Sequence, residues 1–179
     1  MIQVGTREEL SALMPHGGIA AEVGVWKGEH AAIMLDKNAP KRLFLIDQWY
    51  HFDDPSNPNV RDKTQEEIDD IYVSVCERFK RNREVSILRG ESREMAAILP
   101  YSMFDWVYID ACHEYDAIKA DLEAWWNNIK SGGFLAGHDY CSQVGVQRAV
   151  DEFVVEHKIA ITYMVSGNST PSFAIRKPE

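Results

Sequence analysis

Residues 104–138, FDWVYIDACHEYDAIKADLEAWWNNIKSGGFLAGH, hold one complete strand–helix–strand unit. The apolar runs Phe104–Asp110 and Phe134–His138 are typical of buried strands. Between them, residues 114–129 are long enough for a helix, which Ser131-Gly132-Gly133 ends. Two strands joined through a helix of this length run parallel in one sheet. This unit therefore predicts an α/β fold.

The same alternation continues on both sides of this unit. Further strands are predicted at residues 18–25, 42–47 and 84–89, and further helices at residues 6–14, 28–35, 64–81, 92–99 and 146–157. The last two predicted strands, Ile159–Val165 and Ser172–Arg176, have no helix between them, so one of them should run antiparallel. We expect a doubly wound sheet of about seven strands with helices on both faces, formed by residues 1–179 as a single domain.

Composition limits the classes of function. The 179 residues are 45% apolar and 26% charged, which is typical of a globular domain. No apolar run is long enough to span a membrane, and no signal peptide is visible at the N-terminus. Three scattered cysteines fit a reducing compartment, so we expect a cytoplasmic protein. A net charge of -9 argues against nucleic acid as a partner and leaves a small molecule as the expected ligand.

Two glycines and an acid at predicted strand ends point to a ligand site. In doubly wound sheets, ligands bind outside the carboxyl ends of the strands, where the strand order reverses. Gly24 and Gly28 bracket the turn that leads from the strand at residues 18–25 into the next helix. Asp47 ends the following strand, 23 positions after Gly24. An acid at this place accepts hydrogen bonds from ribose hydroxyls in dinucleotide-type folds. The alternatives are a plain turn for the glycines and a helix N-cap or solvated loop acid for Asp47.

The spacing of the glycines departs from the G-x-G-x-x-G fingerprint of dinucleotide sites. Val25, Trp26 and Lys27 fill the turn, and the Trp26 side chain would crowd a diphosphate. The turn therefore favours a nucleoside ligand without a diphosphate over NAD.

Four features of the strand ends carry a resemblance to a known family. They are the E-x-G-x-x-x-G turn, the acid after the second strand, the G-E-S turn after the third and the acid after the fourth (Glu22, Gly24, Gly28, Asp47, Gly90–Ser92 and Asp110). With them the chain resembles the class I S-adenosylmethionine-dependent methyltransferases. IDACHEYDAIKADLEAWW followed by KSGGFLAGHDY more narrowly resembles the small methyltransferase domains that include the macrocin-type sugar O-methyltransferases. The resemblance implies a Rossmann-like, mostly parallel sheet whose last strand is antiparallel.

The resemblance also implies a set of residues that bind S-adenosylmethionine. Glu22 and Gly24 would lie near its methionine end, and Asp47 would hold the ribose hydroxyls. Gln48, with Trp49, would cover the adenine face. Glu91 and Ser92 would lie at the adenine edge, although many relatives have an aspartate where Glu91 stands. Asp110, at the end of the fourth strand, completes the cofactor-binding set.

Two acids and two histidines gather at the ends of two strands expected to be neighbours: Asp110, His113, His138 and Asp139. A hydroxyl acceptor must lose its proton to a base or to a metal. His113, with an ordinary pKa of about 6.5, is the predicted base, assisted by Asp110. Asp110 and Asp139 offer oxygen ligands that suit Mg²⁺, and the resemblance implies a metal held by Asp110, His138 and Asp139. His138 stands where relatives often have an acid, which favours a softer ion or a direct contact with the substrate.

The long segment 50–63 follows Asp47 and is either a substrate lid or a surface excursion. Residues 1–17 are expected to form a lead-in helix, and a homodimer is plausible. The sequence thus predicts methyl transfer to a small-molecule acceptor at a hydroxyl oxygen. An NAD-linked oxidoreductase and a non-catalytic nucleoside-binding module on the same fold are the alternatives.

Overall fold

The computed structural model describes residues 1–52, 58–141, 145–167 and 170–179. Helices and strands alternate along most of the chain. In order they are β1 (Ile2–Val4), α1 (Arg7–Ala12), β2 (Ile19–Val23), α2 (Glu29–Asn38), β3 (Arg42–Asp47), α3 (Pro58–Arg61), α4 (Gln65–Phe79), β4 (Val85–Arg89), α5 (Ser92–Ile98), β5 (Phe104–Ile109), α6 (Tyr115–Asn128), β6 (Ile129–Gly137), α7 (Val146–Glu156), β7 (Ile161–Val165) and β8 (Phe173–Arg176).

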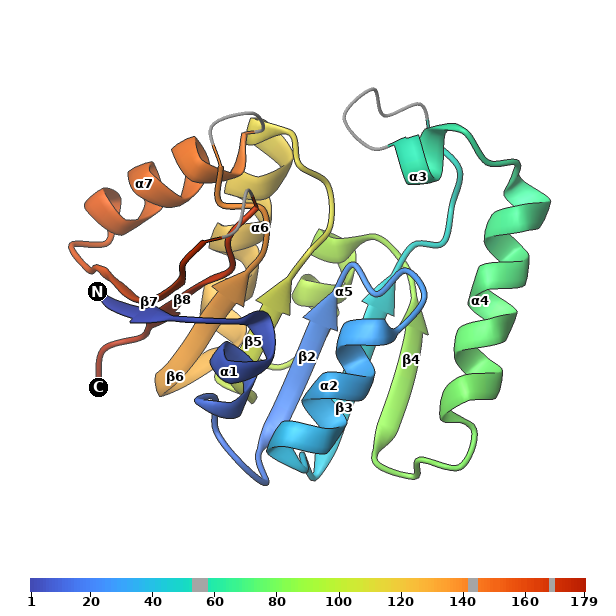
Figure 1. The fold of residues 1–179 in the computed structure, drawn as a ribbon, viewed down its shortest axis with the longest axis horizontal. Coiled ribbons are helices and arrows are strands. Elements are labelled where there is room, and N and C mark those ends of the chain that lie inside the picture. Colours follow the sequence, from blue (N-terminus) through green and yellow to red (C-terminus); the bar gives the residue numbers. More distant parts are fainter. Residues whose placement is uncertain (53–57, 142–144, 168–169) are drawn as a thin grey trace.

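Within these described ranges, eight strands form one mixed sheet in the order β1-β7-β8-β6-β5-β2-β3-β4 (Figure 1). β8 runs antiparallel to both of its neighbours, β6 and β7, and the other pairs are parallel. The prediction of a mostly parallel, doubly wound sheet with an antiparallel last strand is therefore confirmed. β1 adds a strand to the seven expected: it pairs with β7, with Ile2 opposite Tyr163.

Helices cover both faces of the sheet because its strands are apolar on both sides. In β5, Trp106 and Tyr108 face a core built with α1, α2 and α4, whereas Val107 and Ile109 face a core built with α5, α6 and α7. This alternation follows from the period of two along a strand. No helix in the described residues is both long and apolar enough to cross a membrane.

Local capping fixes where two of the helices begin. Thr64 and Glu67 form a reciprocal capping box at the start of α4, where the helix predicted at residues 64–81 begins. At α1, Thr6 accepts a hydrogen bond from the Glu9 amide, while the Glu9 carboxylate bonds the amide of Gly5. The start of α1 matters for the site because this helix carries Arg7.

The strand order reverses between β2 and β5, which are neighbours although their connections lead to opposite ends of the sheet. The carboxyl ends of these two strands hold Gly24 and Asp110. This is the place where doubly wound folds bind their ligands.

Candidate active site

A pocket of about 390 Å³ opens at the carboxyl ends of β2, β3 and β5. This volume lies in the usual range for small-molecule sites. The structure brings most of the predicted site residues to its wall: Glu22, Gly24, Asp47, Gln48, Glu91, Ser92, Asp110, His113 and Asp139. Tyr50, Phe52 and Val60, from the predicted lid, also line it, while residues 53–57 of that segment lie outside the described residues.

Gly24 lets the backbone of β2 pass close to that of β5. Its φ is +87°, and a Cβ built on it would lie 2.0 Å from the carbonyl oxygen of Asp110. Any side chain at this position would therefore collide with the neighbouring backbone. The glycine thus lets the turn after β2 and the start of the loop after β5 meet at the wall of the pocket, where the strand order reverses.

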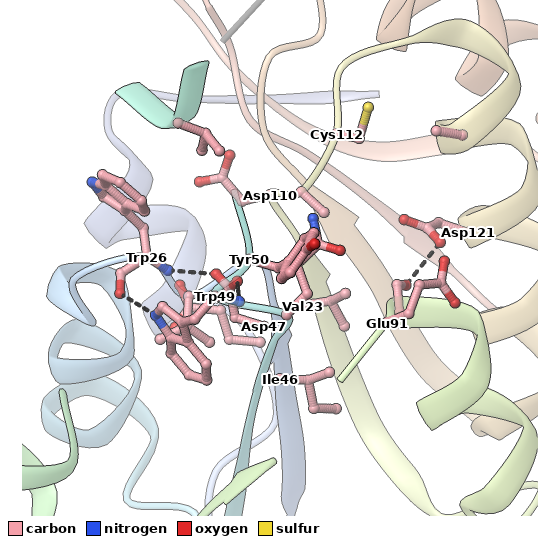
Figure 2. A pocket seen from close by; sticks show the side chains of 18 of the residues that line it. Val23, Trp26, Ile46, Asp47, Trp49, Tyr50, Glu91, Asp110, Cys112 and Asp121 are labelled. Atoms are coloured by element: carbon pink, nitrogen blue, oxygen red, sulfur yellow. Dashed lines mark hydrogen bonds between the residues drawn. The ribbon is translucent and has the colours of Figure 1, made fainter. Parts of the chain in front are cut away.

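Asp47, at the end of β3, holds two turns of backbone in place. Its Oδ2 accepts from the Trp26 amide at 2.9 Å and its Oδ1 from the Trp49 amide at 2.8 Å (Figure 2). The Trp49 indole donates to the Trp26 carbonyl at 3.0 Å. Both tryptophans have positive φ, 51° and 39°, which bulky residues seldom adopt and which is frequent at functional sites. A carboxylate has about four lone-pair sites, so Asp47 can still accept from a ribose hydroxyl beside these amides.

Burial raises the pKa of Asp47, although the amides of Trp26, Trp49 and Val25 and the charge of Arg89 act in the opposite direction. The carboxylate is thus held by backbone dipoles rather than by a close ion pair. Such a group recognises hydroxyl donors without a competing cation.

Glu22 is buried under the pocket and pairs with His30 of α2. The Glu22 Oε1 lies 3.1 Å from His30 Nδ1, and His30 Nε2 lies 3.1 Å from the hydroxyl of Ser11. Burial raises the pKa of Glu22 well above its ordinary value and lowers the pKa of His30 well below its own. The second oxygen of Glu22, Oε2, is buried without a hydrogen-bond partner among the described residues.

The hydroxyl of Ser11 fixes the positions of the protons in this network. Ser11 donates its only proton to the Arg7 carbonyl, so it accepts one from His30 Nε2. A neutral His30 then has no proton on Nδ1 and must accept one from Glu22. A neutral pair of Glu22 and His30 is the form that the directions of both pKa shifts favour.

Arg7 brings a cation to the part of the pocket wall that holds Asp110. Its Nη2 donates to Asp110 Oδ2 at 2.6 Å, and its guanidinium carbon lies 4.8 Å from the centre of the Tyr108 ring. The two partners of the ion pair are 103 positions apart in the chain. Asp110 therefore meets a guanidinium in a place where the sequence suggested a metal.

Asp139 orients both histidines of the predicted catalytic cluster. Its Oδ2 lies 2.9 Å from His113 Nε2 and its Oδ1 lies 3.2 Å from His138 Nδ1. Burial alone would raise the pKa of Asp139, but the bonds from the two histidines outweigh it and hold that pKa well below its usual range. Asp139 is thus a carboxylate placed to stabilise a protonated imidazole.

Three side chains offer ligand atoms that lie within 4.8 Å of one another: Asp110, His113 and Asp139. The predicted set had His138 in place of His113. Both carboxylates are already engaged, Asp110 by Arg7 and Asp139 by the two imidazoles. Mg²⁺ prefers oxygen ligands, and here it would lie beside a guanidinium, whose charge repels it. The donors therefore do not fit magnesium, and we assign no step to a metal.

The predicted adenine edge is already rich in internal bonds. The Glu91 carboxylate caps α5 by accepting from the amides of Arg93 and Glu94 at 2.9 and 3.0 Å. The Ser92 hydroxyl donates to Asp121 Oδ1 at 2.7 Å and accepts from the Trp125 indole at 2.9 Å. The ligand contacts predicted for Glu91 and Ser92 remain predictions.

Asp121 of α6 is a pocket acid that the sequence analysis did not single out. It is 4% exposed and lies beside Glu91, across the pocket from Asp47 (Figure 2). Burial raises the pKa of Asp121 to about 6, helped by the charge of Glu91 and opposed by the Ser92 hydrogen bond. Its place among the apolar positions Ile118, Leu122 and Trp125 was the available signal, since an acid on a buried helix face needs a reason.

Comparison with known proteins places this arrangement in a family. A family model described as a methyltransferase domain matches residues 21–140. A search of curated proteins found no match.

Among solved structures, the chain resembles a putative methyltransferase from Streptococcus mutans in complex with SAH, with a TM-score of 0.66 and 12% identity over 94% of this chain and 93% of that one. It resembles the N-methyltransferase NodS from Bradyrhizobium japonicum with a TM-score of 0.63 and 15% identity, over 97% and 92%. A protein of the O-methyltransferase family from Burkholderia thailandensis gives a TM-score of 0.68 at 9% identity, over 96% of this chain and 55% of that one.

At these identities the structures show a shared fold, which is that of the class I methyltransferases. The family match covers Gly24, Asp47, Asp110 and the histidine cluster. The chain belongs to the methyltransferase-domain family.

Proposed function

We propose that the chain transfers a methyl group from S-adenosylmethionine to a hydroxyl oxygen of a small molecule. The observation that carries this proposal is the pocket itself: Gly24, Asp47 and Glu22 line one cavity at the point where the strand order reverses. Two of the similar solved structures, the one from S. mutans and one of NodS, are described as complexes with SAH, the product form of this cofactor.

The wall of the pocket fits the parts of this cofactor. The Asp47 oxygens would accept from the ribose hydroxyls, and Gly24 would let the ligand lie against the backbone. The unpartnered Oε2 of Glu22 would meet the amino-acid end. When bound, S-adenosylmethionine supplies an electrophilic methyl group on a sulfonium.

His113 would take the proton of the acceptor hydroxyl. The imidazolium formed in this way would be stabilised by Asp139, whose carboxylate already lies 2.9 Å from His113 Nε2. The loop that carries His113 is fixed at its back, because the Gly145 amide donates to the His113 carbonyl at 2.9 Å. A fixed base reduces the orientational cost of the transfer.

The first turn of the pocket disfavours the oxidoreductase alternative. A dinucleotide places its diphosphate on the N-terminus of the helix after the first strand of the fold. Here that helix, α2, starts with Glu29, an exposed acid that is one of the residues lining the pocket, and the turn before it holds Trp26. The negative charge of Glu29 and the bulky indole of Trp26 are poor neighbours for the two phosphates of a dinucleotide.

Thermal unfolding with S-adenosylhomocysteine, with NAD⁺ and without ligand tests the cofactor. A ligand at 100 times its dissociation constant adds about 2.7 kcal/mol, which is a shift of several degrees for a domain of this size. We expect a shift with S-adenosylhomocysteine alone. A shift with NAD⁺ instead would replace the proposal by the oxidoreductase.

A second experiment tests catalysis and the base. Paired acceptors that differ only in a hydroxyl or an amine are incubated with S-adenosylmethionine, and S-adenosylhomocysteine is measured. We expect release with the hydroxyl member, and His113→Ala should abolish it while keeping cofactor affinity. His16→Ala, at an exposed histidine, is the matched control. Unchanged turnover in His113→Ala would refute the base, and cofactor binding without turnover on any acceptor would favour the non-catalytic module.

A further inference from the structure

Two buried atoms, one on an acid and one on a guanidinium, lack hydrogen-bond partners among the described residues. Glu22 Oε2 is buried with no hydrogen-bond partner in the described part of the chain, and Arg7 Nε is in the same state. Both residues line the pocket. Buried polar atoms are almost always paired, so two unpaired atoms at the wall of one cavity indicate a ligand that supplies a donor and an acceptor.

Arg7 has more donors than its partners use. A guanidinium carries five N–H groups, and the described structure uses one of them, in the bond from Nη2 to Asp110 Oδ2. That bond and the face of Tyr108 hold the side chain in place. The guanidinium is thus oriented by Asp110 and still able to bind an anion.

Arg7 and Glu22 also act on each other electrostatically. The charge of Arg7 opposes the rise of the Glu22 pKa, and Glu22 contributes to the raised pKa of Arg7. An acid and a guanidinium near each other at one end of a cavity are complementary to a zwitterion, whose ammonium would go to Glu22 and whose carboxylate would go to Arg7.

We propose that Arg7 binds the α-carboxylate of the cofactor, so that Arg7 and Glu22 form a clamp for its amino-acid end. The inference rests on the proposed function, because S-adenosylmethionine supplies the zwitterion. It assigns a role to α1, which the sequence analysis treated only as a lead-in helix.

One short helix positions both halves of this clamp. Arg7 and Ser11 lie four residues apart on one face of α1. Arg7 reaches the pocket directly, while Ser11 bonds His30, which bonds Glu22. A shift of α1 would therefore move the carboxylate-binding group and the support of the ammonium-binding group together.

Lys27 is the competing cation, because it also lines the pocket, from the turn after β2. Lys27 is exposed, whereas Arg7 is partly buried, and a fully solvated ammonium gains less from an anion than a partly buried guanidinium does. Lys27→Met is therefore the matched control for Arg7→Met.

The test is calorimetric titration with three ligands: S-adenosylhomocysteine, its decarboxylated analogue, and 5′-methylthioadenosine, which lacks the whole amino-acid end. In the wild type, loss of the carboxylate should weaken binding about 10- to 100-fold. Arg7→Met should bind S-adenosylhomocysteine and the decarboxylated analogue within about threefold of each other. Its affinity for 5′-methylthioadenosine should stay at the wild-type level, which shows that the rest of the pocket is intact.

The outcomes separate the clamp from the proposed function. Wild-type protein that binds none of the three ligands would overturn the cofactor and the clamp together. Binding of S-adenosylhomocysteine that does not weaken on decarboxylation would overturn the clamp alone. A loss of the carboxylate effect in Lys27→Met, with the effect kept in Arg7→Met, would make Lys27 the anchor. If Arg7→Met does not fold, the wild-type ligand series decides, and Arg7→Lys should retain only part of the carboxylate effect.

Discussion

A Cβ on Gly24 would lie 2.0 Å from the carbonyl oxygen of Asp110, although the two residues belong to the ends of different strands. This closeness lets the turn after β2 and the loop that begins at Asp110 line one cavity. It also makes the position intolerant of any side chain.

We therefore expect Gly24→Ala to lower the free energy of unfolding by more than about 3 kcal/mol and to abolish binding of S-adenosylhomocysteine, because backbone must move on both strands. Gly17→Ala is the control, since Gly17 has a similar positive φ of 66° but open space around its Cβ position. That variant should lose about 1–2 kcal/mol, the cost of the left-handed backbone alone. Urea unfolding measures the free energy of unfolding of both variants. Equal losses in Gly24→Ala and Gly17→Ala would contradict a destabilising contact between the new side chain and Asp110.

Asp121 should make the stability of the protein depend on pH. Its folded pKa, about 6, lies above its ordinary value of 3.8, so the folded state prefers the protonated acid. The stabilisation is complete below about pH 4 and is lost as the pH rises through 6, which amounts to at most about 3 kcal/mol.

Asp121→Asn removes this loss of stability because an amide does not ionise, and its oxygen can still accept from the Ser92 hydroxyl. We expect the variant to gain stability over the wild type at pH 7.5 and little at pH 4.5, in urea unfolding at both values. Asp116→Asn, at an exposed position on the same helix, should show no such difference. A gain for Asp121→Asn that is the same at both pH values would contradict the assigned pKa.

Glu22 should release a proton when the cofactor binds. Burial raises the pKa of Glu22 well above its ordinary value in the free protein, whereas an ammonium beside it favours the carboxylate. The affinity for S-adenosylhomocysteine should therefore rise as the pH rises past the pKa of Glu22 in the free protein. Calorimetry in two buffers of different ionisation enthalpy measures the proton count. Glu22→Gln, which can still donate to His30, should bind without proton release; release of the same size in this variant would place the proton elsewhere.

The ion pair between Arg7 and Asp110 should keep divalent cations out. We expect wild-type protein to bind Mn²⁺ only at millimolar concentration, followed by the electron paramagnetic resonance signal of the free ion. Arg7→Met releases Asp110 and removes a repelling charge, so it should bind Mn²⁺ more tightly. Uptake of one Mn²⁺ per wild-type chain at micromolar concentration would restore the metal site predicted from the sequence.

Local patterns in the sequence predicted most of the fold. The strand Arg42–Asp47 was predicted with the bounds that the structure shows, because its apolar run and terminal acid are complete in six residues. The capping box of Thr64 and Glu67 is also a local motif, since it lies within four residues at the start of α4. β1 was missed, since three residues are too few to show an alternation and its partner, β7, is remote in the chain.

Some residues of the candidate site could likewise be predicted from local patterns in the sequence, and others could not. Gly24, Asp47 and Asp110 stand at strand ends that the sequence marks, and the structure brings them to one pocket. Arg7 carried no signal, because an arginine in a short amphipathic helix looks solvated until its partner, 103 positions away, is known. The internal bonds of Ser92 depend on Asp121 and Trp125 of another helix, and no spacing in the sequence reports them.

Because β1 pairs with β7, the two parts of the pocket should form at different times during folding. Trp26, Asp47 and Trp49 belong to neighbouring elements of the chain, and their contacts close short loops. α1 contacts β7 as well as α2, and β1 has its partner at residues 163–165. Contacts so remote form slowly, and during synthesis they wait until residues 163–165 have left the ribosome. The part of the pocket formed by Trp26, Asp47 and Trp49 should therefore form early in folding, whereas Arg7 and Ser11 should reach their places last.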